Sequence, residues 1–362
     1  MVGQGNLFGV EHRLEDLSRE GDPLEQLSKV VDFQMFSSVL RRAIRRYDRG
    51  LGGRRGHDEL LKFKMLVLQS LYNLSLHQTS WQVKDRLSWQ RFCGIGLGDV
   101  VPDENTLWDF REALIREKVL DKLFRRLDEA INKAGYLPMG GQIIDATLVP
   151  APRQRMNKDE KQAVKDGIIP EEWQDNPKKL SQKDCDARWT VQMMKGRPSE
   201  NGQMQPDLVI PFYGYKNHIS VDRRHLFIRS SIGTDAASGD GPRLREGLVV
   251  RNTSSLVWAD TAYRSAANEE YLEQQGKVSL IHRKKPKGKP MPTRTRKANA
   301  RKSSVRARIE HVFADEKGGP GFIIRTIGLA RAKATMVFKN MTYNMKRLCF
   351  YKRKEELALM PG

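Results

Sequence analysis

Cysteine is scarce in this chain, and the residues present are far apart. Cys93, Cys185 and Cys349 are odd in number and form no C-x-x-C pair. This distribution argues against a disulfide framework and against a thiolate zinc site, and it is typical of proteins from a reducing compartment.

Long hydrophobic runs are also absent. No stretch approaches the roughly 18 apolar residues of a membrane span. The first residues, MVGQGNLFGVEHRLEDLS, lack the basic-then-apolar pattern of a signal peptide. We therefore expect a cytoplasmic protein with no membrane contact. The 362 residues, 39% hydrophobic and 30% charged, suffice for two or three globular domains.

Acidic residues are scarce in the last quarter of the chain. Residues 281–362 contain 22 Lys and Arg but only 5 Asp and Glu, which gives +17 of the total net charge of +20. Such a concentration of positive charge indicates a polyanionic partner, for which nucleic acid is the usual candidate. The stretch HRKKPKGKPMPTRTRKANARK, residues 282–302, has no apolar face for a membrane surface, and its Pro and Gly predict an extended basic loop along DNA phosphates. The lysines expected to contact DNA are Lys284, Lys285, Lys287 and Lys289.

Residues 1–137 predict an all-α domain, because apolar residues recur at helical spacing. DELLKFKMLVLQSLYNLSL and SWQVKDRLSWQRFCGIG are two such runs. A third, NTLWDFREALIREKVLDKLFRRLDEAINKAG, follows the capping residues Asp103 and Asn105 and is closed by Gly135. Short helices with small turns fit a DNA-binding helix-turn-helix and a dimerisation bundle equally well, and the pattern does not choose between them.

Residues 138–350 predict an α/β domain, followed by a tail at 351–362. The expected strands are GQIIDATLVPAP, the hairpin FYGYKNHISVD and HLFIRSSIGTD, then SLVWADTAY and KVSLIHR. Helices are expected at GPRLREGLVV, at SAANEEYLEQQG and after the basic loop. This order predicts a mixed sheet flanked by helices. A polar insertion, 151–208, is either functional or mobile.

Two aspartates are candidates for a site because each ends an apolar strand, Asp145 in IIDATLV and Asp260 in VWADTAY. Strand ends are where ligands meet an open α/β sheet, so these carboxylates lie side by side if their strands are neighbours. Glu310, in SSVRARIEHVFADEKGG, comes from a helix that can pack over them. Three carboxylates at one edge repel each other unless a cation lies among them, and oxygen ligands suit Mg²⁺ or Mn²⁺. Two such ions would serve phosphodiester chemistry.

At helical spacing, Arg306 and Lys317 fall on the same face as Glu310. The simplest interpretation is a surface salt bridge, which contributes only about 0.3–0.5 kcal/mol. The alternative is that Glu310 ligates a metal while the two cations hold phosphate oxygens.

Other polar and aromatic residues receive structural interpretations first. Asp240, before a helical run, is expected to be an N-cap rather than a catalytic acid. Lys216 and His218 share one face of a strand, where they either approach the active edge or face solvent. A packing or helix-face role is expected for His311. Trp258 and Tyr263 are expected to be core and wall residues, with base stacking as the alternative.

The chain resembles bacterial insertion-sequence transposases of the DDE type, in the insertion-sequence-five family, from about residue 55 to 350. The most specific stretches are DATLVPAPRQR, DARWT, YGYKNHISVDRRH, VWADTAYRSAANE, HRKKPKGKPM, RARIEHVFADEK and RTIGLARAKA. The resemblance implies an RNase H-like catalytic domain and assigns the three catalytic acids to Asp145, Asp260 and Glu310. Arg306, Glu310 and Lys317 match the wider group's Tyr-x2-Arg-x3-Glu-x6-Lys signature, whose Tyr position is Ser303 here.

The predicted activity is DNA transposition. Two Mg²⁺ ions, for which Mn²⁺ can substitute, would assist cleavage at the element ends and transfer of the 3′-hydroxyl to target DNA. The resemblance implies inverted terminal repeats as ligand, a homodimer or larger assembly on double-stranded DNA, and action at the bacterial nucleoid. The alternatives are a metal-dependent nuclease that cuts without joining and a DNA-binding regulator, which would be expected to have lost an acid.

Overall fold

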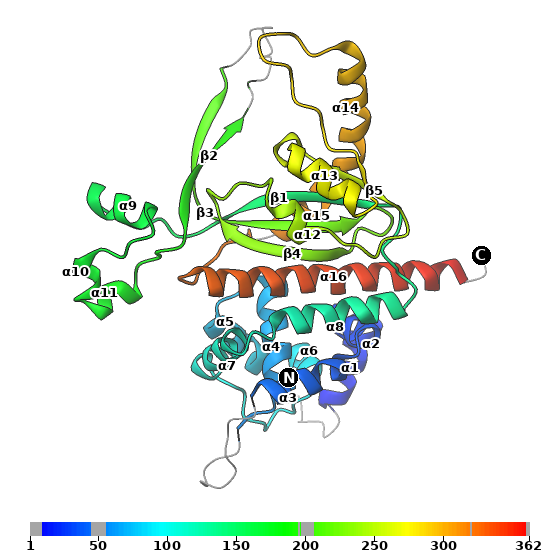
Figure 1. Cartoon of the computed structure of the whole chain (residues 1–362). Helices are drawn as coiled ribbons and strands as arrows, with labels where there is room; N and C mark the ends of the chain where they lie inside the picture. The colour runs from blue at the N-terminus through cyan, green and yellow to red at the C-terminus, as the bar shows by residue number, and fades with distance from the viewer. Residues whose placement is uncertain (1–8, 45–55, 195, 197–205, 319–320, 360–362) are drawn as a thin grey trace. The chain divides into compact units, whose positions relative to one another are not determined.

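The chain forms two compact units (Figure 1). The computed structural model describes residues 9–44, 56–194, 196, 206–318 and 321–359. Unit 1 comprises Met1–Gly135 with Val337–Gly362, and unit 2 comprises Tyr136–Met336. The expected catalytic domain ended at residue 350, whereas the boundary between the units falls inside the last helix, after Met336.

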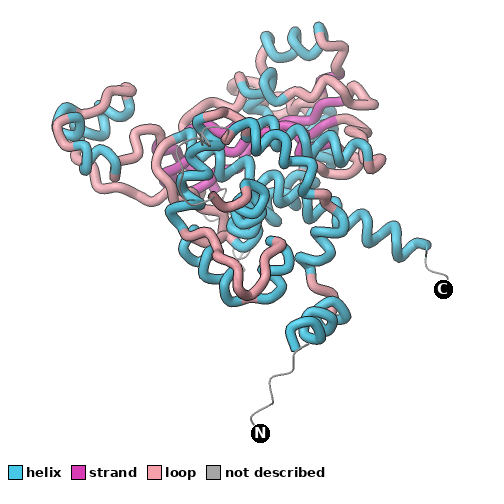
Figure 2. The backbone as a smooth tube through the Cα atoms, turned by 90° about the horizontal axis from the view of Figure 1, so that it is seen from below, coloured by secondary structure: helices cyan, strands magenta, loops and turns pink. Residues whose placement is uncertain are grey.

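Unit 1 is helical, as predicted for the N-terminal region. Every strand of the described chain lies in unit 2 (Figure 2). The helices of unit 1 before residue 135 are α1 (Gly9–Arg19), α2 (Pro23–Val30), η1 (Phe33–Phe36), α3 (Ser37–Ala43), α4 (Glu59–Tyr72), α5 (Leu76–Asp85), α6 (Leu87–Cys93), α7 (Glu104–Arg116) and α8 (Leu120–Lys133).

Aromatic packing holds α4 at the centre of unit 1. The Phe63 ring lies 4.7 Å from the Phe36 ring and 5.8 Å from that of Phe338, which is on α16 (Leu329–Leu359). Asp103 caps α7 as expected, accepting a hydrogen bond from the Thr106 N–H. The long third run is two helices rather than one, because the backbone adopts the left-handed conformation at Lys118 (φ +50°), which a continuous right-handed helix does not contain.

Unit 2 is built around a mixed sheet, confirming the predicted α/β class. Its elements are β1 (Gln142–Pro150), α9 (Lys158–Lys165), α10 (Glu171–Gln174), α11 (Pro177–Ser181), β2 (Arg188–Met194), β3 (Leu208–Asp222), β4 (Ile228–Asp235), α12 (Arg243–Gly247), β5 (Leu256–Ala259), η2 (Thr261–Tyr263), α13 (Ala266–Gln274), β6 (Val278–Ser279), α14 (Thr293–Arg306), α15 (Arg308–Lys317) and the start of α16.

The central strand of the sheet is β1. It pairs antiparallel with β3 and parallel with β5, β4 continues the sheet beyond β3, and β6 continues it beyond β5. Ile144 packs in a cluster with α12 and α13 residues, while Val149, five positions on, packs with Phe322 and Met336. Because alternate residues of a strand face opposite sides, apolar clusters cover both faces, as expected for a sheet flanked by helices.

The insertion after β1 is ordered where it is described. It contains α9 to α11 and β2, which pairs with the first half of β3 as a two-stranded ribbon (Figure 1). Asp184, two residues before the DARWT stretch, is 3% exposed and accepts hydrogen bonds from the Tyr215 hydroxyl and from the Ala187 N–H. Asp186 accepts from the N–H of Leu329, the first residue of α16. This stretch therefore anchors the insertion to the sheet.

Three predictions about element boundaries were wrong. The first strand does not end near Asp145, because β1 continues to Pro150 in its pairing with β3. The basic segment 282–302 is a loop only to residue 292; from Thr293 it is helix α14, since no further Pro or Gly interrupts a run of helix-forming Ala, Arg and Lys. The tail predicted at 351–362 is helical to Leu359 for the same reason, with no helix breaker before Pro361.

The helix predicted to carry both Arg306 and Glu310 is interrupted. Ala307 separates α14 from α15, and the Glu310 N–H bonds the Ala307 carbonyl three residues back instead of following the regular pattern. Arg306 therefore ends one helix while Glu310 and Lys317 belong to the next.

Candidate active site

The sheet register places Asp145 and Asp260 next to each other. In the parallel pairing of β1 with β5, Ile144 is opposite Ala259, and each aspartate is the following residue. Asp260 is at the end of its strand, as predicted, whereas Asp145 lies within β1 at the point where β5 stops. Because β5 ends at Ala259, Asp260 follows the last paired residue and lies next to Asp145 at one edge of the sheet.

Asp145 is nearly buried, and both of its oxygens accept hydrogen bonds. Oδ1 accepts from the Ala146 N–H at 2.9 Å, and Oδ2 accepts from Arg306 Nη1 at 2.9 Å. Burial raises the pKa of Asp145 to about 6, although the Arg306 charge lowers it and the nearby Asp260 and Glu310 carboxylates raise it slightly further. Asp145 therefore senses both other acids of the predicted triad.

Asp260 is more accessible and is held through one oxygen. Its side chain is 41% exposed. Oδ1 accepts from the Thr261 N–H at 2.6 Å and the Thr261 hydroxyl at 3.3 Å, and it lies 3.6 Å from Nδ1 of His282. Within the described part of the chain, Oδ2 has no hydrogen-bond or ion-pair partner.

Glu310 lies in the first turn of α15 and is exposed. Its carboxylate makes no hydrogen bond or ion pair with a described residue, and its negative charge is one of the smaller effects that raise the pKa of Asp145. Glu310 and Asp145 are more than 160 residues apart in the sequence. The packing of α15 against β1 brings them into one region of unit 2.

The carboxylates suit a divalent metal by chemistry, but they are not arranged as a closed ligand set here. Among the described residues, no three His, Cys, Asp or Glu side chains are grouped closely enough to hold a metal ion. Three carboxylates are the oxygen donors that Mg²⁺ and Mn²⁺ take. Arg306 occupies Oδ2 of Asp145, while Oδ2 of Asp260 and both oxygens of Glu310 are available. Metal ligation by Asp145 through Oδ2 requires Arg306 to move.

The predicted DNA-contacting residues lie at different places. Lys284, Lys285, Lys287 and Lys289 are exposed in the loop before α14, and Lys317 is exposed at the end of α15. Arg306 is directed to Asp145, and its Nε is buried without a hydrogen-bond partner among the described residues. The guanidinium is therefore held at this site mainly through Nη1.

The N-cap role predicted for Asp240 is wrong. Helix α12 begins at Arg243, and no side chain caps it. Instead, Asp240 Oδ1 lies 2.8 Å from Lys216 Nζ, which also donates to the Ser238 carbonyl at 2.8 Å. The carboxylate binds a strand lysine because the loop after β4 folds back over β3.

The neighbours of this ion pair are also buried. His218 is 2% exposed, its Nε2 lies 2.9 Å from the Thr234 hydroxyl, and burial lowers its pKa to about 4. Lys216 and His218 thus share a face, as expected, and the face is not solvated. Trp258 and Tyr263 are 5% and 1% exposed and belong to the core, whereas His311 is exposed on α15.

Two residues at the site were given no role by sequence reasoning. His282, just after β6, lies 3.6 Å from Asp260, and its Nε2 lies 3.3 Å from the Ser303 hydroxyl. The segment KVSLIHR predicted only a strand, and nothing in the spacing of residues 282 and 303 links them to Asp260.

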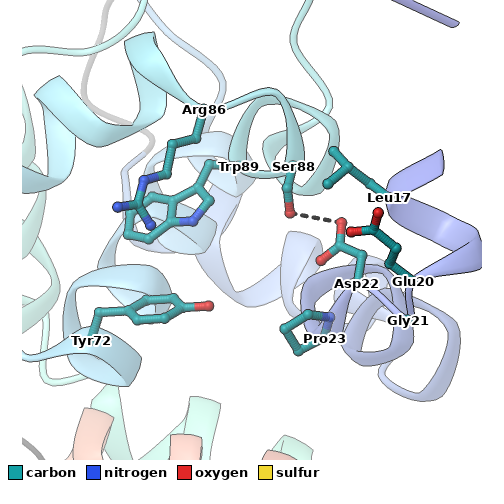
Figure 3. Close-up of a pocket in the computed structure, with 9 residues that line it drawn as sticks. All are labelled: Leu17, Glu20, Gly21, Asp22, Pro23, Tyr72, Arg86, Ser88 and Trp89. Atoms are coloured by element: carbon teal, nitrogen blue, oxygen red, sulfur yellow. Dashed lines mark hydrogen bonds between the residues drawn. The ribbon is translucent and has the colours of Figure 1, made fainter. Parts of the chain in front are cut away.

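Unit 1 contains a pocket of about 310 Å³, between α1, α2, α4 and α6 (Figure 3). The Tyr72 and Trp89 rings stack at 4.8 Å, and Arg86 lies 5.4 Å from the Trp89 ring. Burial alone would raise the pKa of Asp22, but hydrogen bonds from Ser88 and Arg91 lower it overall. The buried carboxylate of this pocket, Asp22, is already bound by Ser88 and Arg91, so we assign the pocket no chemistry.

Two family models match the chain. The model described as "Transposase domain (DUF772)" matches residues 12–113, and the model described as "Transposase DDE domain" matches residues 137–345, which is more than half of the chain. No solved structure matches. In the described residues, no helix is both long and apolar enough to cross a membrane.

The second match agrees with the RNase H-like arrangement of the sheet and spans Asp145, Asp260 and Glu310, and the first covers most of the helical unit. The chain belongs to the DDE transposases, enzymes of DNA transposition typical of insertion sequences.

Proposed function

We propose that this transposase cuts DNA at the inverted terminal repeats of an insertion sequence and joins the freed 3′-hydroxyl to target DNA. The observation that carries the proposal is the β1–β5 register, which sets Asp145 beside Asp260, with Glu310 near enough for its charge to raise the pKa of Asp145. We also infer membership of the insertion-sequence-five family from the sequence stretches quoted above.

The three acids are proposed as the metal ligands and catalytic residues. Asp145, Asp260 and Glu310 would hold two Mg²⁺ ions, or Mn²⁺ in their place. Bound ions of this kind activate the attacking oxygen and stabilise charge on the phosphate. Asp145 must lose its proton to ligate, and because its pKa without metal is raised to about 6, the proton should compete with metal binding below that pH.

Arg306 has two successive roles in this account. In the structure it neutralises Asp145 at 2.9 Å, which offsets repulsion among the acids. Once displaced, its guanidinium remains beside the site and can bind a phosphate oxygen with two N–H groups. Lys317 would contact the same DNA from the far end of α15.

The basic segment before and within α14 is proposed as the DNA-backbone contact. Helix α14 carries six Lys and Arg and no acidic residue. With Lys284, Lys285, Lys287 and Lys289, it forms a continuous positive stretch suited to phosphates. Because two element ends must be joined, we propose that a homodimer or larger assembly acts on double-stranded DNA, at the nucleoid in the cytoplasm.

A strand-transfer assay tests the proposal. The purified chain is incubated with Mg²⁺, a labelled duplex ending in the element's terminal repeat, and a supercoiled target plasmid. We expect nicks at the repeat boundary and label joined to the plasmid. Cleavage without joined product would identify a nuclease instead, and binding without cleavage would identify a DNA-binding regulator.

A further inference from the structure

Helix α14 is docked on unit 2 without an apolar contact surface. None of its residues is buried, and its sequence, TRTRKANARKSSVR, has no hydrophobic face. Polar side chains at positions 299, 302, 303 and 306 lie along one side of the helix, the spacing of a single helical stripe. What these four side chains contact therefore determines where α14 sits.

These four side chains contact the parts of unit 2 that lie next to Asp145 and Asp260. Asn299 makes two hydrogen bonds with the backbone of Arg283, at 3.1 and 3.0 Å, and Lys302 Nζ donates to the Ile281 carbonyl at 3.0 Å. Arg306 binds Asp145, and the remaining member, Ser303, meets the His282 ring. Helix α14 is thus joined to both aspartates, directly to Asp145 and through His282 to Asp260.

His282 is placed between Ser303 and Asp260. It is 7% exposed, and its backbone N–H donates to the Ala259 carbonyl, which fixes it beside the end of β5. Nε2 lies 3.3 Å from the Ser303 hydroxyl, and Nδ1 lies 3.6 Å from Asp260 Oδ1. A neutral imidazole has one N–H and one acceptor nitrogen. Since an ionised carboxylate has no proton to give, the tautomer that suits both contacts has its N–H on Nδ1, facing Asp260, and accepts the Ser303 O–H at Nε2, although 3.6 Å is an ion-pair distance rather than a hydrogen bond.

We propose that His282 and Ser303 are positioning residues that orient Asp260 for metal binding. The N–H and the hydroxyl of Thr261 donate to Oδ1 of Asp260, and His282 Nδ1 lies 3.6 Å from the same atom, which leaves Oδ2 without a hydrogen bond or ion pair to a described residue. Groups that fix a ligating carboxylate strengthen metal binding by limiting its rotation, and their loss typically costs about 10- to 100-fold in affinity or activity. This inference rests on the proposed function, because it takes Asp260 to be a ligand.

Ser303 occupies the position of the tyrosine in the signature of the wider group. Serine, like tyrosine, has a hydroxyl group, and in this chain that hydroxyl lies 3.3 Å from Nε2 of the His282 imidazole. A substitution that removes the hydroxyl should therefore act on Asp260 through His282 and leave the Arg306–Asp145 contact in place.

Calorimetric titration of the full chain with Mn²⁺, without DNA, tests the proposal. We expect His282→Phe to weaken Mn²⁺ affinity about 10- to 100-fold, and His282→Asn, which keeps an amide donor near the Nδ1 position, to recover most of the loss. Ser303→Ala should weaken affinity several-fold. Ser304→Ala is the matched control, because Ser304 is exposed and, among the described residues, its hydroxyl bonds only the Arg301 carbonyl of its own helix.

The outcomes separate this inference from the proposed function. Asp260→Asn is the reference: if it abolishes Mn²⁺ binding while His282→Phe and Ser303→Ala bind normally, the positioning role is wrong and the metal site stands. If Asp260→Asn itself binds Mn²⁺ and cleaves DNA normally, the proposed function fails. Equal losses in His282→Phe and His282→Asn would indicate packing only. If thermal melting in chelator shows that His282→Phe is unfolded, the Mn²⁺ affinity of Ser303→Ala decides whether the positioning role holds, because Ser303 is exposed and its substitution should leave the fold intact.

Discussion

Opposing effects act on the Asp145 side chain. Burial disfavours its charge, and the Arg306 guanidinium at 2.9 Å favours it, yet the pKa is raised from 3.8 to about 6. Burial therefore outweighs the ion pair. The folded chain binds this proton more tightly than the unfolded chain, so without metal the ionised Asp145 destabilises the fold.

The pH dependence of stability should show this effect. Because the folded pKa lies above 3.8, the folded state holds the extra proton between pH 4 and 6, and stability from this group falls as pH rises through that window. The difference between 3.8 and about 6 corresponds to about 3 kcal/mol. We expect the free energy of unfolding of Asp145→Asn, relative to the wild type in chelator, to increase by up to that amount from pH 4 to 7.

Denaturant unfolding of the wild type and of Asp145→Asn, in chelator at a series of pH values, measures this difference in unfolding free energy. Loss of the Arg306 partner in the variant is the same at every pH in this range, so it shifts the whole curve without changing its slope. A difference that stays flat from pH 4 to 7 would show that Asp145 titrates normally in the fold.

The Lys216–Asp240 pair leads to a stability prediction. Asp240→Ala leaves Lys216 Nζ, on a side chain 15% exposed, with only the Ser238 carbonyl, and should cost about 1–3 kcal/mol. Lys216→Met combined with Asp240→Ala should recover part of the loss, because no unpaired charge is left. Thermal melts and cleavage rates below the melting temperature check both. An Asp240→Ala variant that melts normally but does not cleave would mean that the second catalytic acid is misassigned.

At the scale of elements, sequence patterns located strands better than they located helix ends. Asp145 and Asp260 were found because each follows a short apolar run, and the pairing of those runs then follows from the topology of the sheet. The continuation of β1 past Asp145 was missed because the aspartate interrupts the apolar run, whereas pairing with β3 extends the strand to Pro150.

Tertiary contacts explain the rest of what the sequence did not predict. The Pro and Gly residues of 286–292 suggested a loop that in fact ends at α14, and the break at Ala307 has no local sequence signal. His282 and Ser303 are 21 residues apart on different elements, so their contact depends on the docking of α14. The ion pair between Lys216 and Asp240 likewise depends on how the loop after β4 folds back over β3.

The basic loop and α14 should contribute separately to DNA affinity. Arg294, Lys297 and Arg301 are exposed on one side of α14. Each phosphate contact contributes about 0.9 to the slope of log K against log salt. Replacing these three by Ala should reduce the slope by up to about 2.7, and replacing Lys284, Lys285, Lys287 and Lys289 should reduce it by up to about 3.6.

A charge-matched control distinguishes contact from net charge. Lys158, Lys161 and Lys165 are exposed on α9, and their replacement by Ala removes the same charge as the α14 substitutions. Fluorescence anisotropy across a salt series gives the three slopes. If the α9 and α14 variants lose equal slope, α14 does not contact the phosphates.

For the whole molecule, the two units have different compositions and matched different family models. Unit 2 contains the aspartates and the glutamate, together with most of the excess positive charge, while the helical region before residue 135 matches its own transposase model. End binding and catalysis should therefore be separable in variants of the full chain. Substitutions that remove a carboxylate charge should leave DNA affinity intact, since they reduce repulsion of phosphate.

The most direct measurement compares cleavage and end binding in Asp145→Asn, Asp260→Asn and Glu310→Gln, with Asp240→Asn as the control carboxylate. On terminal-repeat DNA in Mg²⁺, each of the three should lose cleavage while gel shifts show binding within a few-fold of the wild type, because a shared metal site fails when one ligand is lost. Asp240→Asn should cleave. Cleavage at the wild-type rate by any one of the three would remove that residue from the site and contradict the proposed triad.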